Sequence, residues 1–263
     1  MSLDENRDTS ELGSPAGGLR LQTALHELRE EALLRRAEEL DEFASVASHE
    51  LQEPLRKLVA FSSLLAQDLG PELPERAERD LWYITDAAGR MLRLVQDLLT
   101  LSRVGRAALR WDRISLDYCA DLAIEALLSR IEESHAEITR DPLPEVWGDW
   151  TMLVQLYQNL IANALKFVRR PPPVVRLTCQ ERDGLRVFGV KDNGIGIAPE
   201  DADQIFLPFK RLHGRDQYEG TGIGLAICRK VVERHRGTIW VESELNKGAH
   251  FRFTLAQPST AST

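Results

Sequence analysis

Apolar residues recur at three- and four-residue steps along the first hundred residues of the chain, a spacing typical of amphipathic helices. Within 19–69 only Pro54 interrupts this spacing, and a proline inside a helix removes one backbone donor and bends the axis. The segment GPELP at 70–74 is rich in helix-breaking residues, and a second apolar stripe follows from about 75 to 104. The sequence therefore predicts two long helices joined by a short turn.

The predicted hairpin, which we place at 41–108, has an apolar stripe that two helices alone cannot cover. A second copy of the chain would cover it, so we expect a homodimer built on a four-helix bundle. Ahead of the hairpin, 19–40 carries imperfect heptads and is predicted to form a parallel coiled-coil helix. Residues 1–18 are polar and rich in Gly, Ser and Asp, and we expect them to be disordered.

The pattern changes after Arg110, where shorter elements of two kinds alternate. Periodicity predicts helices at 116–133, 149–168 and 223–236. Short apolar or alternating runs predict strands at 137–139, 145–147, 174–180, 185–192, 238–243 and 249–255. Together they indicate an α/β sandwich over 112–256, a mixed sheet covered by helices on one face, with a flexible tail at 257–263. The predicted fold class is therefore α+β, with an all-α hairpin ahead of the sandwich.

Composition narrows the functions that the chain can have. The 263 residues carry a formal net charge of −8, which argues against binding to nucleic acid or anionic lipid through a basic face. No stretch reaches the roughly eighteen apolar residues of a membrane span, and the N-terminus lacks the apolar core of a signal peptide. We therefore expect a cytoplasmic protein. Its three cysteines are widely spaced in apolar runs and indicate neither a disulfide nor a zinc site.

One face of the predicted helix at 149–168 carries a polar row. Gln155, Asn159, Asn163 and Lys166 follow each other at steps of four, four and three, which places them on the same side of a helix. A carboxamide oxygen can ligate Mg²⁺ and an ammonium can neutralise phosphate, so the row suits a Mg²⁺–triphosphate. Taken alone, such a row is more often a solvated helix face.

Two glycine-rich segments follow. In DNGIGI (192–197) Asp192 ends a predicted strand, and Gly194 and Gly196 allow the backbone to approach a planar ligand, although a plain turn has the same composition. The segment GTGIGLAI (220–227) is not a dinucleotide fingerprint, because Leu225 stands where that motif needs glycine. It is compatible with a flexible loop that leads into a helix N-terminus, where free amides hold phosphate oxygens.

His49 lies in the segment SHELQEPLRK (48–57), directly before Glu50 and five residues before Pro54. A lone histidine on a helix is most often an ordinary surface or core residue. This one has a carboxylate beside it that can orient the ring and accept a proton, and a neutral imidazole is a nucleophile at cytosolic pH. Together with the segments downstream, this favours His49 as the acceptor in a phosphoryl transfer.

Taken together, SHELQEPLRK, NLIANALKF (159–167), DNGIG (192–196) and GTGIG (220–224) resemble the motifs of sensor histidine kinases of two-component signalling. The resemblance extends over roughly 35–256 and is strongest to the kinase modules of bacterial phytochromes. It implies an ATP-dependent enzyme that phosphorylates His49, with Glu50 as base, and passes the group to an aspartate in the receiver domain of a separate response regulator. The signal would come from an upstream sensor domain or a sensory partner.

The resemblance also implies a nucleotide site for ATP and Mg²⁺. Asn163 takes the place of the Mg²⁺ ligand, and Asp192 that of the acceptor for the adenine amino group. Asn159 and Lys166 would lie beside the phosphates. The other positions implied to contact the nucleotide are Phe167, Gly194, Gly196, Lys210, Arg211, Gly220, Thr221, Gly222, Gly224 and Leu225.

One position departs from the common pattern of the family. Four residues after the acceptor, many members carry Thr or Asn, which orients water for dephosphorylation of the regulator, whereas this chain has Glu53. Two other readings compete: another GHKL-superfamily kinase or ATPase, such as a serine kinase, and a catalytically silent dimeric scaffold that binds nucleotide. The first does not need His49, and the second does not need Asn163, Asp192 or the three glycines of 220–224.

Overall fold

The computed structural model describes residues 46, 48, 50–70, 73–106, 108–169, 172–182, 184–212, 214 and 217–256. The chain divides into two compact units, Met1–His49 and Glu50–Thr263, and nearly all of the first lies outside the described residues. Four predictions therefore fall outside them: the disordered N-terminus at 1–18, the coiled-coil helix at 19–40, the structural setting of His49, and the tail at 257–263.

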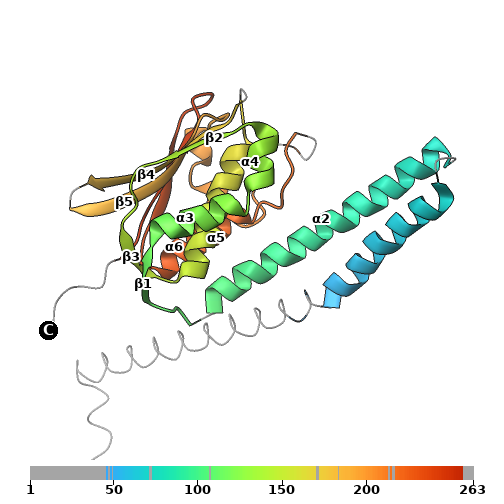
Figure 1. Cartoon of the computed structure of the whole chain (residues 1–263), viewed down its shortest axis with the longest axis horizontal. Coiled ribbons are helices and arrows are strands. Elements are labelled where there is room, and N and C mark those ends of the chain that lie inside the picture. The colour runs from blue at the N-terminus through green and yellow to red at the C-terminus, as the bar shows by residue number, and fades with distance from the viewer. Residues whose placement is uncertain are drawn as a thin grey trace, which may run out of the picture. The chain divides into compact units, whose positions relative to one another are not determined.

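Two helices form a hairpin at the start of the second unit (Figure 1). The first helix is described from 50 to 69 and runs through Pro54 without a break. The second, α2 (Glu75–Arg106), carries Glu75 and Glu78 in its first turn, where carboxylates favour the positive end of the helix dipole. The prediction of two helices separated by the segment 70–74 is confirmed. In the described part of the chain, no helix combines the length and the apolarity that crossing a membrane requires.

A five-stranded mixed sheet follows the hairpin. β2 pairs with β4 in parallel, and every other neighbouring pair is antiparallel. Its strands, in their order across the sheet, are β2 (Glu137–Arg140), β4 (Val174–Arg182), β5 (Leu185–Asp192), β7 (Ala249–Thr254) and β6 (Ile239–Ser243). A separate antiparallel pair is formed by β1 (Asp112–Ser115) and β3 (Glu145–Gly148).

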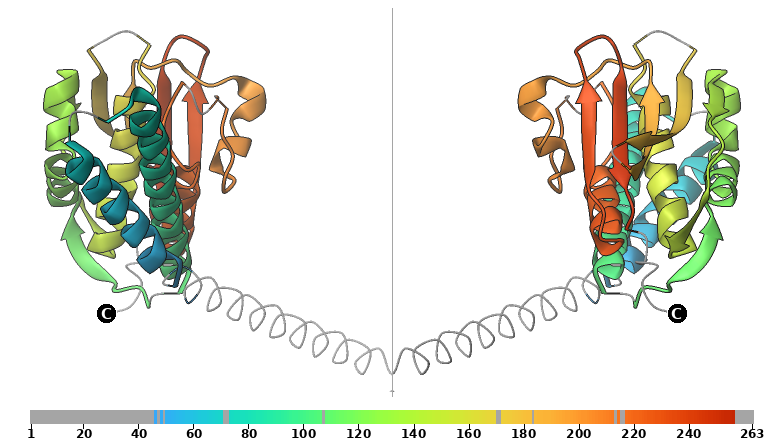
Figure 2. Two further views of the ribbon diagram at one scale, coloured as in Figure 1. Left: turned by 90° about the vertical axis from the view of Figure 1, so that its right-hand side faces the viewer. Right: turned by 90° about the vertical axis from the view of Figure 1, so that its left-hand side faces the viewer.

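Helices cover one face of this sheet, as predicted, and Figure 2 shows the strands and the helices as two layers. The helices are α3 (Leu116–Glu125), α4 (Leu128–Ser134), α5 (Trp150–Lys166) and α6 (Gly224–Arg234). Between the layers, Phe188 and Val190 of β5 stand opposite Phe253 and Phe251 of β7, and all four are buried against α5 and α6. The period-two pattern of these strands thus supplies the core face on which α5 rests.

The predicted helix at 116–133 is interrupted in the structure. Helix α3 ends at Glu125, the N–H of Leu127 bonds the carbonyl of Ile124 at 3.0 Å, and α4 begins at Leu128. Such a three-residue step is the tighter winding common at helix ends, and no glycine or proline marks it in the sequence. β1 and two short 3-10 helices, η2 (Pro199–Asp201) and η3 (Gln204–Phe206), were not predicted either.

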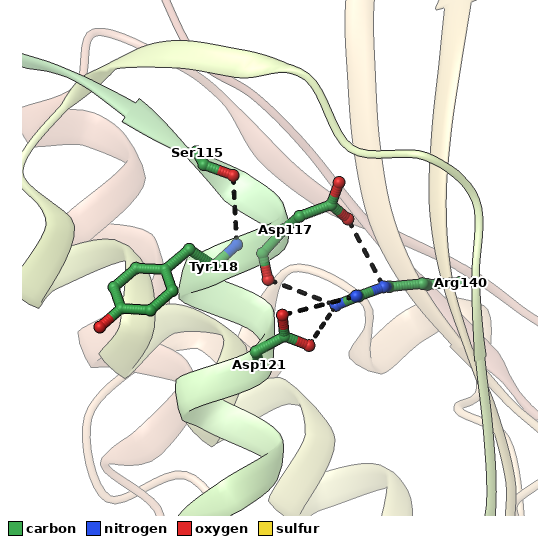
Figure 3. Close-up of polar contacts among 5 residues, drawn as sticks. All are labelled: Ser115, Asp117, Tyr118, Asp121 and Arg140. Carbon is green, nitrogen blue, oxygen red and sulfur yellow. Dashed lines mark hydrogen bonds and ion pairs between the residues drawn. The ribbon is translucent and has the colours of Figure 1, made fainter.

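Polar contacts fix the start of α3 against the edge strand β2 (Figure 3). The Ser115 hydroxyl caps the helix by accepting from the N–H of Tyr118 at 3.3 Å. Arg140 of β2 donates to Asp121 Oδ1 at 2.5 Å and to the backbone carbonyl of Asp117 at 3.3 Å. Each exposed ion pair contributes at most about 1 kcal/mol, but together they hold the helix layer in place over the sheet.

Candidate nucleotide site

Helix α5 positions the polar row that the sequence predicted. Its N-terminus is capped by Asp149, whose Oδ1 accepts from the N–H groups of Thr151 and Met152 at 3.0 and 3.3 Å. The apolar side of the helix is buried in the core, so the row faces away from the sheet. Only its C-terminal part, Asn163 and Lys166, lines a cavity.

This cavity has a volume of about 790 Å³, within the usual range for small-molecule sites. Its walls come from the end of α5, the end of β5, the loop before α6, and the first turns of α6, with further residues from α2 and α4. The predicted positions that line it are Asn163, Lys166, Phe167, Asp192, Gly196, Lys210, Arg211, Gly220, Thr221, Gly222, Gly224 and Leu225.

Asp192 places a carboxylate in the wall of the cavity at the end of β5. Its Oδ1 accepts from the N–H groups of Gly194 and Ala249 at 2.8 and 3.0 Å, whereas Oδ2 takes no part in these bonds. Burial raises the pKa of Asp192 above its ordinary value, and the two backbone bonds oppose this shift. Only glycine fits at 194, because a Cβ there would lie 2.2 Å from the carbonyl oxygen of Phe167.

Lys166, at the end of α5, brings a positive charge to the cavity. Its ammonium lies 4.1 Å from the centroid of the Phe167 ring. Burial, reinforced by the neighbouring charge of Arg211, lowers the pKa of Lys166 to about 8. The glycine loop approaches closely, since a Cβ at Gly220 would lie 2.7 Å from Lys166 Nζ. A bound anion in this region would favour the protonated ammonium and raise this pKa again.

The segment before α6 is held by contacts within the protein. Arg211 donates from Nη1 to the carbonyl of Gly220 at 2.6 Å and from Nη2 to the carbonyl of Tyr218 at 2.7 Å. Lys210 Nζ donates to Gln204 Oε1 at 2.6 Å. Both cations line the cavity, yet both are engaged by neighbouring protein oxygens. Helix α6 starts at Gly224 without a side-chain cap, which leaves its first amides for an anion.

Not every predicted position lines the cavity. Asn159 and Gly194 are not among its lining residues, and Asn159 Oδ1 instead accepts from Gln155 Nε2 at 3.5 Å. His49 lies outside the described residues, and Glu50 is an exposed residue of the first hairpin helix.

Other lining residues were missed by the sequence analysis. They include Arg93, Gln96 and Asp97 of α2 and Arg130, Glu133 and Ser134 of α4. No local motif marks these positions, because folding alone brings their helices to the cavity.

Apart from the cavity, the hairpin carries a set of large apolar side chains that are exposed. A soluble monomer seldom leaves so many of them uncovered along one element, so such a surface indicates an interface. The exposed residues are Leu51, Leu58, Phe61, Leu64, Leu65 and Leu69 on the first helix and Trp82, Tyr83, Ile84 and Met91 on α2.

Both the hairpin and the domain that follows it match known protein families. Residues 39–107 match the His Kinase A (phospho-acceptor) domain, and residues 148–259 match the histidine kinase-, DNA gyrase B- and HSP90-like ATPase family. The chain belongs to the sensor histidine kinases. The family matches confirm the motif resemblance, and the structure confirms the predicted α+β architecture.

Among relatives of known sequence, cyanobacterial phytochrome A of a Nostoc species is 44% identical over 217 residues, covering 82% of this chain and 28% of its own length. The phytochrome-like protein Cph1 of Synechocystis is 39% identical, with 82% and 29% covered. The chain thus spans less than a third of these relatives. Among solved structures, full-length ShkA in complex with AMPPNP has a TM-score of 0.62 at 28% identity, and the match covers 82% of this chain and 47% of ShkA.

Proposed function

We propose that this chain is an ATP-dependent protein-histidine kinase that transfers the γ-phosphoryl group of ATP to its own His49. The observation that carries the proposal is the cavity of about 790 Å³, because it gathers the carboxylate of Asp192, the amide of Asn163, the ammonium of Lys166 and the glycine loop. Each group suits one part of a Mg²⁺–nucleotide. The carboxylate is a hydrogen-bond acceptor for the base, the amide is a ligand for a hard cation, and the ammonium and the loop amides are donors for phosphate. The family and its relatives support the same activity.

In this account Asp192 accepts a hydrogen bond from the adenine amino group, and Gly194 and Gly196 let the backbone lie close to the base. The glycine loop and the first amides of α6 bind the phosphates, with Lys166 beside them. Mg²⁺ supplies charge neutralisation at the phosphates when it is bound. The residues fit it, because Mg²⁺ prefers oxygen ligands and needs few from the protein, and Asn163, whose carboxamide can supply an oxygen, lines the cavity.

The transfer itself uses the segment at 48–57. An imidazole nitrogen of His49 attacks the γ-phosphorus, the bond between that phosphorus and the bridging oxygen breaks, and ADP leaves with the electron pair. Glu50 accepts the proton that the ring loses as the N–P bond forms. Phosphoryl transfer asks the protein mainly for in-line placement and charge neutralisation, which the cavity residues provide.

We further propose that the active form is a homodimer. The exposed apolar surface of the hairpin supports this, because a second hairpin would bury both surfaces in a four-helix bundle. The proposed organisation is a coiled-coil helix at 19–40, the hairpin at 41–108, which overlaps the match at 39–107, and the ATP-binding domain at 112–256.

The phosphoryl group would then pass from His49 to an aspartate in the receiver domain of a separate response regulator. The two phytochrome relatives are much longer than this chain, which covers 28% and 29% of their lengths. We propose that an upstream sensor domain or a sensory partner supplies the signal. The cytoplasm, where response regulators work, is the proposed location.

Two substitutions test the nucleotide site. Replacing Asp192 with Asn should weaken ATP binding by about tenfold or more, because a hydrogen bond to a charged group contributes roughly 1.5–3 kcal/mol. Asn163→Ala should abolish Mg²⁺-dependent labelling by ATP. Asp201→Asn is the matched control, since it removes a carboxylate from η2 outside the cavity. Calorimetric affinities and labelling that are unchanged in both site variants would show that the cavity is not the ATP site.

A further inference from the structure

Helix α2 reaches the cavity although no sequence motif assigns it a place there. Arg93, Gln96 and Asp97 line the cavity together with Lys166 and Thr221. Positions 93, 96 and 97 lie on one face of a helix, at steps of three and four from the first. The hairpin therefore presents a polar row, with one charge of each sign, to the proposed nucleotide site.

A hydrogen bond joins this row to the glycine loop. The Thr221 hydroxyl donates to Asp97 Oδ2 at 2.5 Å, between positions 124 residues apart in the sequence. The same hydroxyl accepts from the N–H of Ile223 at 3.3 Å, immediately before α6 begins. The flanking Gly220 and Gly222 have φ values of 133° and 78°, which glycine adopts easily. Since glycines leave the loop many conformations, the bond to Asp97 helps to select one of them, together with the bonds from Arg211 to the carbonyls of Gly220 and Tyr218.

The carboxylate that holds the loop would also oppose an anionic ligand. Burial raises the pKa of Asp97, whereas the Thr221 hydrogen bond and the charge of Arg93 lower it. A triphosphate at the glycine loop would bring several negative charges near this half-buried carboxylate. Like charges in a partly desolvated site repel more strongly than in water. Binding of a triphosphate and the bond between Thr221 and Asp97 are therefore antagonistic.

We propose that Asp97 is a positioning residue that latches the glycine loop to helix α2 in the nucleotide-free protein, and that ATP binding releases the latch. The inference rests on the proposed function, because it takes the loop as the phosphate site. Its consequence is that loading of ATP frees the loop from the hairpin. Nucleotide binding is then coupled to movement of the ATP-binding domain relative to α2.

The test compares Asp97→Asn, which removes the charge but keeps an acceptor oxygen, with Asp97→Ala, which removes both. Asp86→Asn is the matched control, because Asp86 lies on the same helix, pairs with Arg90 and does not line the cavity. Both Asp97 variants should lower the Kd and the KM for ATP by about three- to tenfold. Adenosine, which has no phosphate, should bind all four proteins equally.

Hydrogen exchange of the backbone amides at 219–225, measured without nucleotide, reports on the latch directly. Exchange should be faster in Asp97→Ala than in wild type and close to wild type in Asp97→Asn. Unchanged exchange in Asp97→Ala, or a gain in ATP affinity matched by an equal gain for adenosine, would overturn the proposal. Failure of every protein, wild type included, to bind ATP would instead contradict the proposed function, and the exchange comparison would still decide the latch.

Discussion

At the scale of single residues, Lys166 shows how folding changes the chemistry of a side chain. The sequence places it on the polar row of α5, where an ordinary lysine would stay charged at every physiological pH. In the folded protein, burial lowers its pKa to about 8. A bound phosphate would raise that pKa again, so ATP binding should take up a proton near this pH.

The affinity for ATP should therefore depend on pH. Between about pH 7 and pH 9 wild-type affinity should fall, by up to about tenfold per unit above the pKa, because the free ammonium is lost. Lys166→Arg should flatten this slope, since a guanidinium stays charged. Lys191→Arg, a change in an exposed lysine of β5 outside the cavity, should leave it as in wild type. Calorimetric titrations with parallel slopes for wild type and Lys166→Arg would rule out Lys166 as a phosphate contact.

The residue scale also shows what the sequence alone could predict of the site. The four-residue step from Asn159 to Asn163 placed both amides on one helix face, but it could not show where the cavity ends along that face. No sequence motif indicated that Asp97 and Arg130 belong to the site. Each lies in an ordinary amphipathic helix pattern and lines the cavity only because of the way its helix packs.

At the scale of elements, the first hairpin helix carries the residue that departs from the family pattern. Glu53 lies one turn after His49 in the sequence, and its Oε1 is 2.6 Å from Lys57 Nζ. Both side chains are largely exposed, so this pair contributes only a few tenths of a kcal/mol. Position 53, four residues after the acceptor in the sequence, therefore carries an exposed carboxylate. A regulator bearing phospho-aspartate would meet that charge.

We therefore predict weak phosphatase activity toward the phosphorylated regulator. Glu53→Thr should increase the rate of phosphate loss by about tenfold or more, because it removes a like charge and supplies a hydroxyl that can orient water. The measurement follows phospho-regulator mixed with kinase and ADP. Asp68→Thr, the same replacement further along the helix, should have no effect. Rapid phosphate loss with wild type, undiminished in Glu53→Ala, would show that position 53 is not the gate.

The sequence predicted the bounds of an element closely where its apolar residues follow one clear helical or strand spacing. Helix α5 was expected at 149–168 and spans Trp150–Lys166, because a buried apolar face and a capping Asp149 mark its length. The helix expected at 116–133 was interrupted by a backbone step that depends on packing, not on composition. β1 escaped prediction because its four residues, Asp112–Ser115, are too few to show a clear alternation and form a strand by pairing with β3, which is distant in the sequence.

At the scale of the whole molecule, the hairpin surface predicts assembly. Leu58 is 50% exposed on the hairpin, and Leu185 is 62% exposed on β5, in the other part of the unit. Light scattering should give twice the chain mass of 29.7 kDa for wild type. Leu58→Lys should weaken the dimer by about tenfold or more, because each buried leucine contributes roughly 1.5–3 kcal/mol, whereas Leu185→Lys should not. A monomeric wild type, or equal loss in both variants, would contradict a hairpin dimer.

The proposed kinase activity requires that a phosphoryl group be transferred to His49. The protein is incubated with Mg²⁺ and ATP labelled in its γ-phosphate, and the label is tested for acid lability and located by peptide mapping. We predict an acid-labile phosphate on His49 in wild type, and no label in His49→Gln although this variant still binds ATP. An acid-stable label, or label that persists in His49→Gln, would contradict the account.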